Sequence, residues 1–557
     1  KACSSMRSLD RGREIHMEIE RQGWVKKSLF IGNALIDLYV KSGYFAKARQ
    51  VLGEMLYPDV ISWTSLIYGY SEHGDNLEAI GCFEEMQIKG VHPNLVTFIC
   101  LLKACGGLGD IEKGLEIHTK IVKLGLMESD VVIGNILVDM YAKCGLPEAA
   151  HHMFDRIPIR NVVSWAALVQ GYVEAELAKE ALQCFDQMQI EGISPDAISF
   201  ISGLKACSLL RAIEKGEELH LQIKTLGLLE GDDVLGNTLI DMYVKCDSLF
   251  KAQCVFDELE TRDVVSWTLI ITGHTQYGAY KQALRCFEQM QLEGIHPNSI
   301  TLVCALKSCS SIRDIFKGQQ LHVYIESHGL VEKDTSVGNT LIDMYAKCGF
   351  LAMARYVFNR LPGHTLVSWS ALISGYAAYG QPEVAINYFE QMGLKGFSPD
   401  AITFVCFLKA CGSIGAMDKV REVHAEVENR GMVTTNVVGN TLVHIYAKCG
   451  LISKAQQVFE SLLVQDVFSW TSFMVGYARL GETEKVCSLF EQMLGAGVKP
   501  DPVTFVVVLN ACVRAGFFEF TRSYYELMSK GYGMMPNFQH NVCIIDLFAR
   551  YGQVDKA

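Results

Sequence analysis

Residues 59–70, DVISWTSLIYGY, decide the fold because the chain repeats this stretch. Related text returns at 161–172 (NVVSWAALVQGY), 263–274 (DVVSWTLIITGH), 365–376 (TLVSWSALISGY) and 466–477 (DVFSWTSFMVGY). The tryptophans are separated by 102, 102, 102 and 101 residues and are Trp63, Trp165, Trp267, Trp369 and Trp470. A period held over almost the whole chain indicates a repeat array. Side chains that recur at the same place in every copy are therefore interpreted first as structural residues and only then as functional ones.

Each period divides into three motifs, which we name after their text. The short motifs read GNxLxDxYxKCG and are predicted at 29–59, 131–161, 233–263, 335–365 and 436–466. The Ser-Trp motifs begin with the quoted stretch and are predicted at 60–94, 162–196, 264–298, 366–400 and 467–501. The LKAC motifs carry LKAC or a close variant of it (LKSC, LNAC), followed by a histidine in the first four copies, and are predicted at 95–130, 197–232, 299–334, 401–435 and 502–537.

The apolar spacing within a motif predicts two helices. In 60–94 the residues Trp63, Leu66, Ile67 and Tyr70 share one helical face, and Gly74 interrupts the pattern. A second helix then begins at Asn76, with the expected inner residues Leu77, Ala79, Ile80, Cys82, Phe83 and Met86. A pair of this size cannot bury its faces alone, whereas stacked pairs can. We predict an all-α, right-handed superhelical solenoid of tandem antiparallel helix pairs, with Phe83, Phe185, Phe287, Phe389 and Phe490 buried between neighbouring helices.

Composition fits one continuous array. No linker or charge block divides the 557 residues, and no apolar run reaches the roughly 18–20 residues of a membrane helix. The chain opens and closes inside a motif, so we expect a fragment whose targeting peptide lies outside it. The net charge of −12 argues mildly against a nucleic-acid partner, although one face of a solenoid can still be basic. One lysine occupies the same slot in each short motif: Lys41, Lys143, Lys245, Lys347 and Lys448. These lysines either belong to a solvent-exposed helix face or form a row of contacts to nucleic-acid phosphates.

The cysteines and histidines predict neither a metal site nor catalysis. Most of the 19 cysteines repeat two slots, and no CxxC pair occurs, so we expect small apolar core residues. The first slot holds Cys144, Cys246, Cys348 and Cys449, and the second holds Cys3, Cys105, Cys207, Cys309, Cys411 and Cys512. The histidines at the end of the LKAC text lie 102 residues apart and cannot converge on one ion: His16, His118, His220, His322 and His424. We expect no catalytic residue, no metal and no cofactor in this chain.

The motif texts resemble the pentatricopeptide repeat (PPR) family. The features that carry the resemblance are VVSWxxLIxGY…EALxCFxxMxxxGxxPD, LKAC…GxxxH and GNxLxDMYAKCG…AxxVFD, and they extend over all 557 residues. The alternation of 31-, 35- and 35- or 36-residue motifs is similar to the plant PLS subclass. In those terms 1–28 is a partial L-type motif, 29–537 holds fifteen motifs in repeating S-P-L order, and 538–557 is a partial C-terminal motif.

The resemblance implies binding of single-stranded RNA, one base to one motif, read by the fifth and the last residue. The implied pairs and bases are Asn33/Asp59 for U, Thr64/Asn94 for A, Asn135/Asn161 for C, Asn237/Asp263 for U, Thr268/Asn298 for A, Asn339/Thr365 for a pyrimidine taken as C, Ser370/Asp400 for G, Asn440/Asp466 for U and Thr471/Asp501 for G. Ala166/Asp196 matches no strong pair. The expected RNA is 5′-UA·C··UA·CG·UG·-3′, where a dot marks a base that is unread or left open.

Two further sets of residues follow from the resemblance. An apolar second residue stacks on each base, and the implied residues are Phe30, Ile61, Val132, Val163, Val234, Val265, Val367, Val437 and Phe468, with Ser336 as the exception. The LKAC motifs carry aliphatic residues at the fifth position and are expected to be spacers or weak readers: Ile99, Ile201, Val303, Val405 and Val506. The structural alternative for an Asn or Thr at the read positions is a helix cap.

Three functions remain open from the sequence. The resemblance favours the target-recognition module of a C-to-U RNA-editing factor in the mitochondrion or chloroplast. The chain itself lacks the deaminase domain that a full-length form can carry, so a deaminase or other editing-complex proteins are expected partners. The alternatives are an RNA binder that stabilises, splices or processes a transcript, and a peptide-binding helical scaffold. We expect no enzymatic activity in this chain and no membrane partner.

Overall fold

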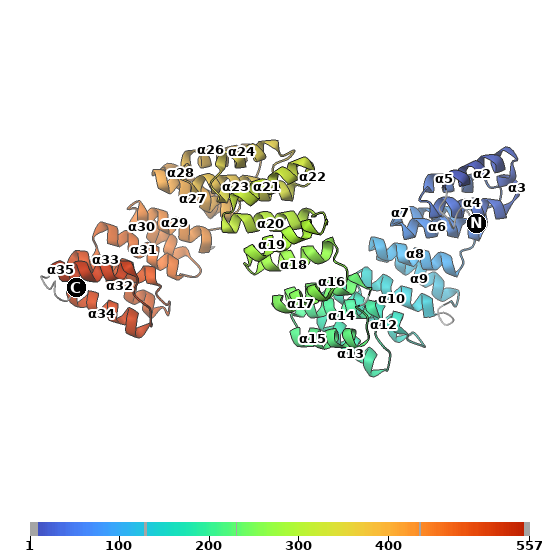
Figure 1. Ribbon diagram of the computed structural model, residues 1–557, viewed down its shortest axis with the longest axis horizontal. Helices are drawn as coiled ribbons and strands as arrows, with labels where there is room; N and C mark the ends of the chain where they lie inside the picture. The colour runs from blue at the N-terminus through green and yellow to red at the C-terminus, as the bar shows by residue number, and fades with distance from the viewer. Residues whose placement is uncertain (1–8, 127–130, 230, 434–435, 551–557) are drawn as a thin grey trace. The chain divides into compact units, whose positions relative to one another are not determined.

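The computed structural model describes residues 9–126, 131–229, 231–433 and 436–550 (Figure 1). All regular elements in these ranges are helices, which confirms the all-α prediction. Cys3 and the end of the C-terminal partial motif lie outside the described residues. None of the described helices is long and apolar enough to cross a membrane.

Each complete motif contributes a first helix, A, and a second helix, B. The short motifs form α4 (Leu29–Lys41) and α5 (Phe45–Glu54), α10 (Val131–Lys143) and α11 (Pro147–Asp155), α16 (Asp233–Lys245) and α17 (Leu249–Glu258), α23 (Thr335–Lys347) and α24 (Leu351–Arg360), and α29 (Asn436–Lys448) and α30 (Ile452–Ser461). The Ser-Trp motifs form α6 (Val60–Glu72) and α7 (Asn76–Ile88), α12 (Val162–Glu174) and α13 (Ala178–Ile190), α18 (Val264–Gln276) and α19 (Tyr280–Leu292), α25 (Leu366–Ala378) and α26 (Pro382–Leu394), and α31 (Val467–Leu480) and α32 (Thr483–Gly495).

The LKAC motifs form α8 (Leu95–Leu108) and α9 (Ile111–Lys123), α14 (Ala197–Leu210) and α15 (Ile213–Thr225), α20 (Ser299–Ile312) and α21 (Ile315–Ser327), α27 (Ala401–Ile414) and α28 (Met417–Asn429), and α33 (Pro502–Ala515) and α34 (Phe518–Glu526), the last continued by a π-helical turn at Leu527–Gly531. The remaining helices are α2 (Leu9–Arg21), α3 (Trp24–Lys27), α22 (Leu330–Lys333) and α35 (Phe538–Arg550).

The chain divides into two compact units, Lys1–Gly273 and His274–Ala557, and the division falls inside α18. In the first unit helix A of each motif packs on helix A of the next, along α4, α6, α8, α10, α12, α14 and α16. In the second unit the same ladder runs along α20, α23, α25, α27, α29, α31, α33 and α35. Each unit is therefore a stack of helix pairs in which the A helices form a continuous layer.

The Ser-Trp stretch has two structural roles: its serine caps the start of a helix, and its tryptophan packs in the core. Ser62 lies at the third position of α6 and makes a capping box with Asp59. Trp63 is 1% exposed, and in later copies the tryptophan ring packs edge-on against the phenylalanine of the preceding short motif, as Trp165 does on Phe154 at 4.6 Å. A Cβ on Gly171 would lie 2.4 Å from Cβ of Ala142, so the glycine lets two A helices approach closely.

The predicted core is correct with three exceptions, of which the first is Ile80, expected inside but half-buried. Phe83, Phe185, Phe287 and Phe490 are buried, together with Ala79, Cys82 and Met86 of α7. Leu77 was expected inside but is 75% exposed, because it lies off the face formed by those α7 residues. Phe389 was expected to be buried but is half-buried. Its ring lies 4.0 Å from Phe407, a slot that holds Leu, Gly, Ala or Val in the other copies, so the larger ring leaves it less room.

Ion pairs join the second helices of neighbouring motifs. Lys113 pairs with Glu84 at 2.9 Å and Lys215 with Asp186 at 2.8 Å. Lys317 with Glu288 and Lys419 with Glu390 repeat the contact in the second unit. The fifth copy replaces the lysine by Phe520, which is 50% exposed. The pairs are partly exposed, so we expect them to set the register between motifs more than to stabilise them.

Candidate nucleic-acid interface

The last residue of each short and each Ser-Trp motif is the N-cap of the next A helix. Its side-chain oxygen accepts the backbone N–H of the Ser or Thr three residues on, for example Ser62 N to Asp59 Oδ1 at 2.9 Å and Thr97 N to Asn94 Oδ1 at 2.9 Å. The other caps are Asn161, Asp196, Asp263, Asn298, Thr365, Asp400, Asp466 and Asp501. The structural alternative considered for these residues is thus correct, and it leaves the second polar atom of each Asn or Asp unused by the cap.

In the short motifs the fifth and the last residue touch directly. The Nδ2 atom of the fifth residue donates to the last residue in all five copies. The distances are 3.2 Å for Asn33 to Asp59, 3.5 Å for Asn135 to Asn161, 3.3 Å for Asn237 to Asp263, 3.0 Å for Asn339 to Thr365 and 2.8 Å for Asn440 to Asp466. The structure therefore brings together each pair that the resemblance singled out in these motifs.

In the Ser-Trp motifs the fifth residue reaches the last one through a third side chain. The hydroxyl of Thr64 lies 2.7 Å from that of Thr97, which contacts Asn94 Oδ1 at 2.9 Å. Ser370 reaches Asp400 through Thr403, and Thr471 reaches Asp501 through Thr504. Ala166 has no hydroxyl to offer Asp196. Thr268 donates to the Val264 carbonyl at 2.5 Å, and its partner residue Asn298 belongs to the other unit.

The second residue of every A helix named for stacking is an exposed apolar side chain. The exposed fractions run from 46% for Val265 to 71% for Phe30, and the others are Ile61, Val132, Val163, Val234, Val367, Val437 and Phe468. Ser336 instead donates to Asp334 Oδ1 at 2.6 Å. The LKAC motifs show the same exposure, which sequence reasoning missed although the slot is apolar in each copy: Val96, Ile198, Ile300, Ile402 and Val503. Their fifth residues are partly exposed aliphatics.

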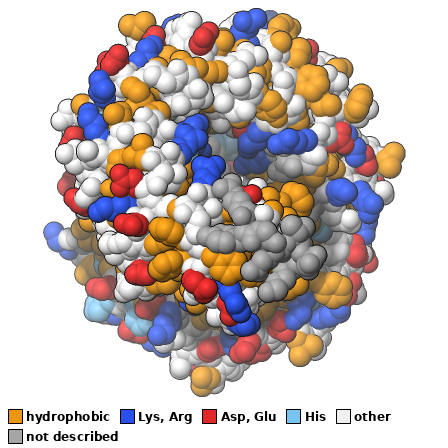
Figure 2. All heavy atoms as spheres, turned by 90° about the vertical axis from the view of Figure 1, so that its left-hand side faces the viewer, with side chains coloured by type: hydrophobic (Ala, Val, Ile, Leu, Met, Phe, Trp, Pro, Cys, Tyr) orange, Lys and Arg blue, Asp and Glu red, His pale blue; other side chains and the backbone are white. Residues whose placement is uncertain are grey.

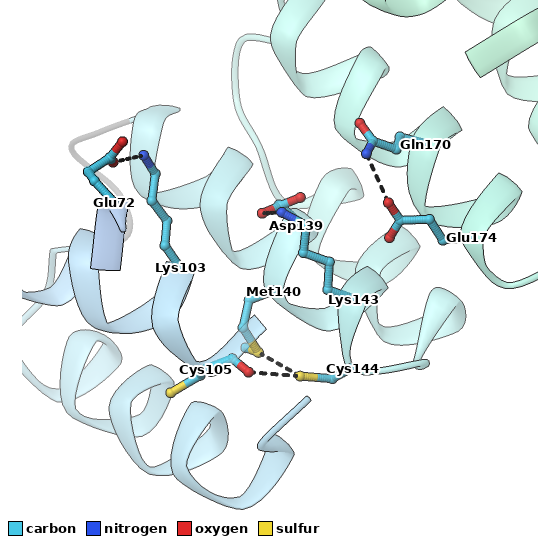
Figure 3. Close-up of polar contacts among 9 residues, drawn as sticks. All are labelled: Glu72, Lys103, Cys105, Asp139, Met140, Lys143, Cys144, Gln170 and Glu174. Carbon is cyan, nitrogen blue, oxygen red and sulfur yellow. Dashed lines mark hydrogen bonds and ion pairs between the residues drawn. The ribbon is translucent and has the colours of Figure 1, made fainter. Parts of the chain in front are cut away.

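Four of the five lysines that occupy this slot of the short motifs lie beside an acid one helical turn earlier. Lys143 pairs with Asp139 at 2.8 Å, close to the Lys103–Glu72 pair of the neighbouring A helices (Figure 3). Lys41, Lys245 and Lys347 repeat the pair with Asp37, Asp241 and Asp343. These aspartates are readable from the DxYxK spacing, which the sequence interpretation did not use. Their negative charge offsets that of the lysines.

The fifth lysine, Lys448, has a different setting. His444 occupies the place of the aspartate, and no acid among the described residues lies within ion-pair distance of Lys448 Nζ. Burial and the positive charges of Lys448, Lys409 and Arg479 lower the pKa of His444. Arg479 also donates to the Lys448 carbonyl at 2.9 Å. This group of cations favours a bound anion more than the other lysine positions do. Elsewhere acidic, basic and apolar side chains intermingle, as on the face in Figure 2.

Hydrogen bonds keep the capping carboxylate of Asp59 charged. Burial raises the pKa of Asp59, but the hydrogen bonds from Ser62 and Asn33 outweigh it, so the pKa lies below its ordinary value. An ionised carboxylate is an acceptor alone, whereas an Asn amide in the same place can donate. The two residues thus make equal caps but present opposite hydrogen-bonding groups.

The periodic histidines are structural. Each Nδ1 contacts the hydroxyl of a tyrosine in the following short motif, with distances of 2.7 to 3.0 Å for His16–Tyr39, His118–Tyr141, His220–Tyr243, His322–Tyr345 and His424–Tyr446. Burial lowers the pKa of His220 and raises that of Tyr243 to about 12. Sequence reasoning missed these pairs, although their spacing of 22 or 23 residues recurs.

The cysteines divide by slot. Cys105, Cys207, Cys309, Cys411 and Cys512 are buried as expected. The other slot was expected on an inner face, yet Cys144, Cys246 and Cys348 are only partly buried and Cys449 is exposed, because this slot is the residue just after the A helix. Among the described residues no group of His, Cys, Asp and Glu could hold a metal ion.

Comparison with known proteins agrees with the motif texts. The PPR repeat family matches residues 58–107, 160–208, 262–311, 364–413 and 465–514, and the PPR repeat matches 33–57, 96–126, 135–162, 237–264, 339–364 and 440–467. A chloroplastic pentatricopeptide repeat-containing protein of Arabidopsis thaliana is 31% identical over 100% of this chain, which spans 64% of that relative. A mitochondrial one is also 31% identical over 100% of this chain, which spans 80% of it.

Solved structures share the fold. The pentatricopeptide repeat protein PPR10 in complex with an 18-nt psaJ RNA element has a TM-score of 0.63 at 19% identity, covering 98% of this chain and 84% of that one. The crystal structure of PPR10 from maize gives 0.55 at 20% identity, covering 100% and 81%. The repeat matches and the identity to full-length relatives lead to one conclusion: the chain belongs to the pentatricopeptide repeat family.

Proposed function

We propose that this chain binds single-stranded RNA in a sequence-specific manner, one base to each short or Ser-Trp motif. The observation that carries the proposal is the recurring placement of the fifth and last residues. They contact each other directly in the short motifs and through one hydroxyl in the Ser-Trp motifs of 60–94, 366–400 and 467–501. Beside them lies an exposed apolar residue on which a base can stack.

The last residue reads the ring nitrogen on the Watson–Crick edge. Because the cap uses one side-chain oxygen, an Asp offers a further acceptor and an Asn offers an amide donor. The acceptor suits U and G, which carry a proton on N3 or N1, whereas the donor suits C and A, which do not. Asp263 is thus assigned to U and Asn161 to C.

The fifth residue separates purines from pyrimidines. An Asn such as Asn237 extends toward the last residue and occupies space, which leaves room for the smaller base. A Thr or Ser such as Thr64 is shorter and leaves room for a purine. With the chain running in the order expected for the family, the preferred RNA is 5′-UA·C··UA·CG·UG·-3′, with 29–59 at the 5′ end.

Binding of labelled 15-nucleotide RNAs tests the proposal. The preferred sequence and a scrambled RNA of equal composition are compared by fluorescence anisotropy at one stated salt concentration, since phosphate contacts depend on salt. We expect tighter binding of the preferred RNA. Equal affinity for both RNAs would contradict base reading, and no binding of either would favour a peptide-binding scaffold.

We further propose that the RNA recognised is an organellar transcript and that the chain is the recognition module of a C-to-U editing factor. Support comes from the 31-, 35- and 36-residue alternation, which resembles the PLS subclass, and from relatives named chloroplastic or mitochondrial. Sequencing of organellar transcripts from a plant that lacks the protein tests this. Loss of editing at a cytidine just 3′ of a matching sequence is expected; a change in transcript abundance or splicing with editing intact would favour the stabilisation or processing alternative.

A further inference from the structure

We propose that the buried threonine at the third position of the LKAC motif is a positioning residue for base specificity. The residues are Thr97, Thr403 and Thr504, and each fixes the direction in which the purine-reading hydroxyl of the preceding motif points its proton. The inference rests on the proposed RNA-binding function and adds a specificity determinant outside the fifth and last positions.

The contacts of Thr97 leave one arrangement of protons that satisfies every group. Its hydroxyl is fully buried and has one proton and two lone pairs. The backbone N–H of Asn94 donates to it at 3.2 Å, and it donates to Asn94 Oδ1 at 2.9 Å. The remaining lone pair faces the hydroxyl of Thr64 at 2.7 Å, so Thr64 is the donor in that contact. The oxygen of Thr64 is then left as an acceptor alone.

The same argument holds more strongly where the cap is a carboxylate. Thr504 donates to Asp501 Oδ1 at 2.8 Å, and a charged acceptor takes the proton in preference to a hydroxyl. The proton of Thr471 is therefore directed to Thr504, 2.8 Å away. Ser370 has two internal acceptors, the Leu366 carbonyl at 2.8 Å and Thr403 at 2.6 Å, so its proton is also held inside the protein.

A fixed acceptor recognises an amino group. Adenine carries its amino group beside N1 on one side and guanine carries its own beside N1 on the other. Because these two amino groups lie on opposite sides of N1, which the last residue reads, one fixed fifth-position oxygen can meet only one of them. We assign it to the 6-amino group of adenine; when guanine is bound, the same oxygen faces the acceptor O6. Without the threonine hydroxyl, the reader can rotate and either donate or accept, and the preference for an amino group weakens. Thr97 therefore sharpens the choice of base without touching the RNA.

The test compares RNAs that differ by one amino group. Two RNAs carry either adenosine or purine riboside, which lacks the 6-amino group, at the base read by 60–94. Binding of each RNA is measured for the parent, Thr97→Val and Thr97→Ser. We expect the parent and Thr97→Ser to prefer adenosine by about two- to tenfold, the range of one neutral hydrogen bond. We expect Thr97→Val to bind the two RNAs within about twofold of each other, by the same measure.

A second variant protects the test against misfolding. Thr504→Val is compared with the parent on RNAs that carry adenosine or guanosine at the base read by 467–501. We expect the ratio of the two affinities to move toward guanosine, because the Thr471 hydroxyl, 2.8 Å from that of Thr504 in the parent, becomes free to donate to O6. Circular dichroism melts check that both valine variants fold. We expect them to fold, because the backbone N–H of residue 97 and that of residue 504 still donate to the side chains of their N-cap residues. A preserved amino-group preference in Thr97→Val, or an unchanged ratio of affinities in Thr504→Val, would overturn the inference. A parent that selects its RNA but ignores the amino group would also overturn it, whereas a parent without sequence selection would overturn the proposed function itself.

Discussion

Replacing Asn94 by Asp should change the second RNA base from A to G and leave the protein equally stable. Asn94 Oδ1 accepts the Thr97 N–H at 2.9 Å and the Thr97 hydroxyl at 2.9 Å, and an Asp oxygen can take the same contacts. Asn and Asp are nearly equal N-caps, so the free energy of unfolding should change by no more than about 0.5 kcal/mol. What changes is the second atom, from an amide donor to a carboxylate acceptor.

The expected size of the exchange follows from the contact that is reversed. A donor that faced N1 of adenine becomes an acceptor for N1–H of guanine, and matched base contacts discriminate by about 1–3 kcal/mol. The ratio of the two affinities should therefore move by about 5- to 150-fold in favour of guanine. The added negative charge weakens binding to all RNAs alike, and it cancels in that ratio.

Anisotropy titrations with four RNAs that differ at the second base measure the ratio at one salt concentration. Asn94→Ala is the matched control. It removes the cap and the reader together, so it should lower unfolding stability by about 0.5–2 kcal/mol and abolish the preference. Asp501→Asn is the reciprocal change and should move its base from G toward A. A uniform loss of affinity in Asn94→Asp, with no exchange at that base, would refute the assignment.

Three other outcomes are expected. Lys245→Ala should weaken binding to all RNAs equally. Lys448→Ala should weaken it more strongly and lower the slope of affinity against salt by about one, because Asp241 offsets the charge of Lys245 whereas Lys448 has no such partner among the described residues. Equal affinity of both variants and the parent would contradict this. Phe185→Ala should lower local stability by about 3–5 kcal/mol, visible as faster hydrogen exchange in 162–196 and its neighbours. Thermal stability should fall from pH 7.5 to pH 5.5. Burial lowers the pKa of His118, His220, His322 and His424 in the folded protein. Their contribution to stability is therefore fully present above the unfolded pKa of about 6.5 and is lost as the pH falls below it. A flat profile would argue against the buried His–Tyr pairs.

The fold was predictable because its signal is repeated. The spacing of Trp63, Leu66, Ile67 and Tyr70 defines one buried face, and the Gly and Pro residues after it mark the helix ends. The pairing of Asn33 with Asp59 could also be anticipated, since the resemblance names the fifth and last positions.

Other features depend on neighbours that the motif text does not reveal. Phe389 is half-buried because Phe407, eighteen residues later, is larger than its counterparts. Thr97 reads as an ordinary capping-box residue, and its contact with Thr64 appears only when helix α6 packs against α8. Such contacts join residues about 33 positions apart, beyond the reach of helical periodicity.

Under the proposed function, the dual role of the last residue explains how nearly identical motifs can read different bases. The cap needs one oxygen, which Asn161, Asp263 and Thr365 all supply, so the fold is indifferent to the choice among them. The base, in contrast, is proposed to meet the side-chain atom that the cap does not use. A change at this position therefore alters specificity at little cost in stability, whereas a change at the fifth position, such as Asn237→Thr, would break a direct side-chain contact in the short motif. The choice between a base with and a base without a proton on the ring nitrogen, set by the last residue, can therefore vary between copies. The choice between purine and pyrimidine, set by the fifth residue, follows the motif type.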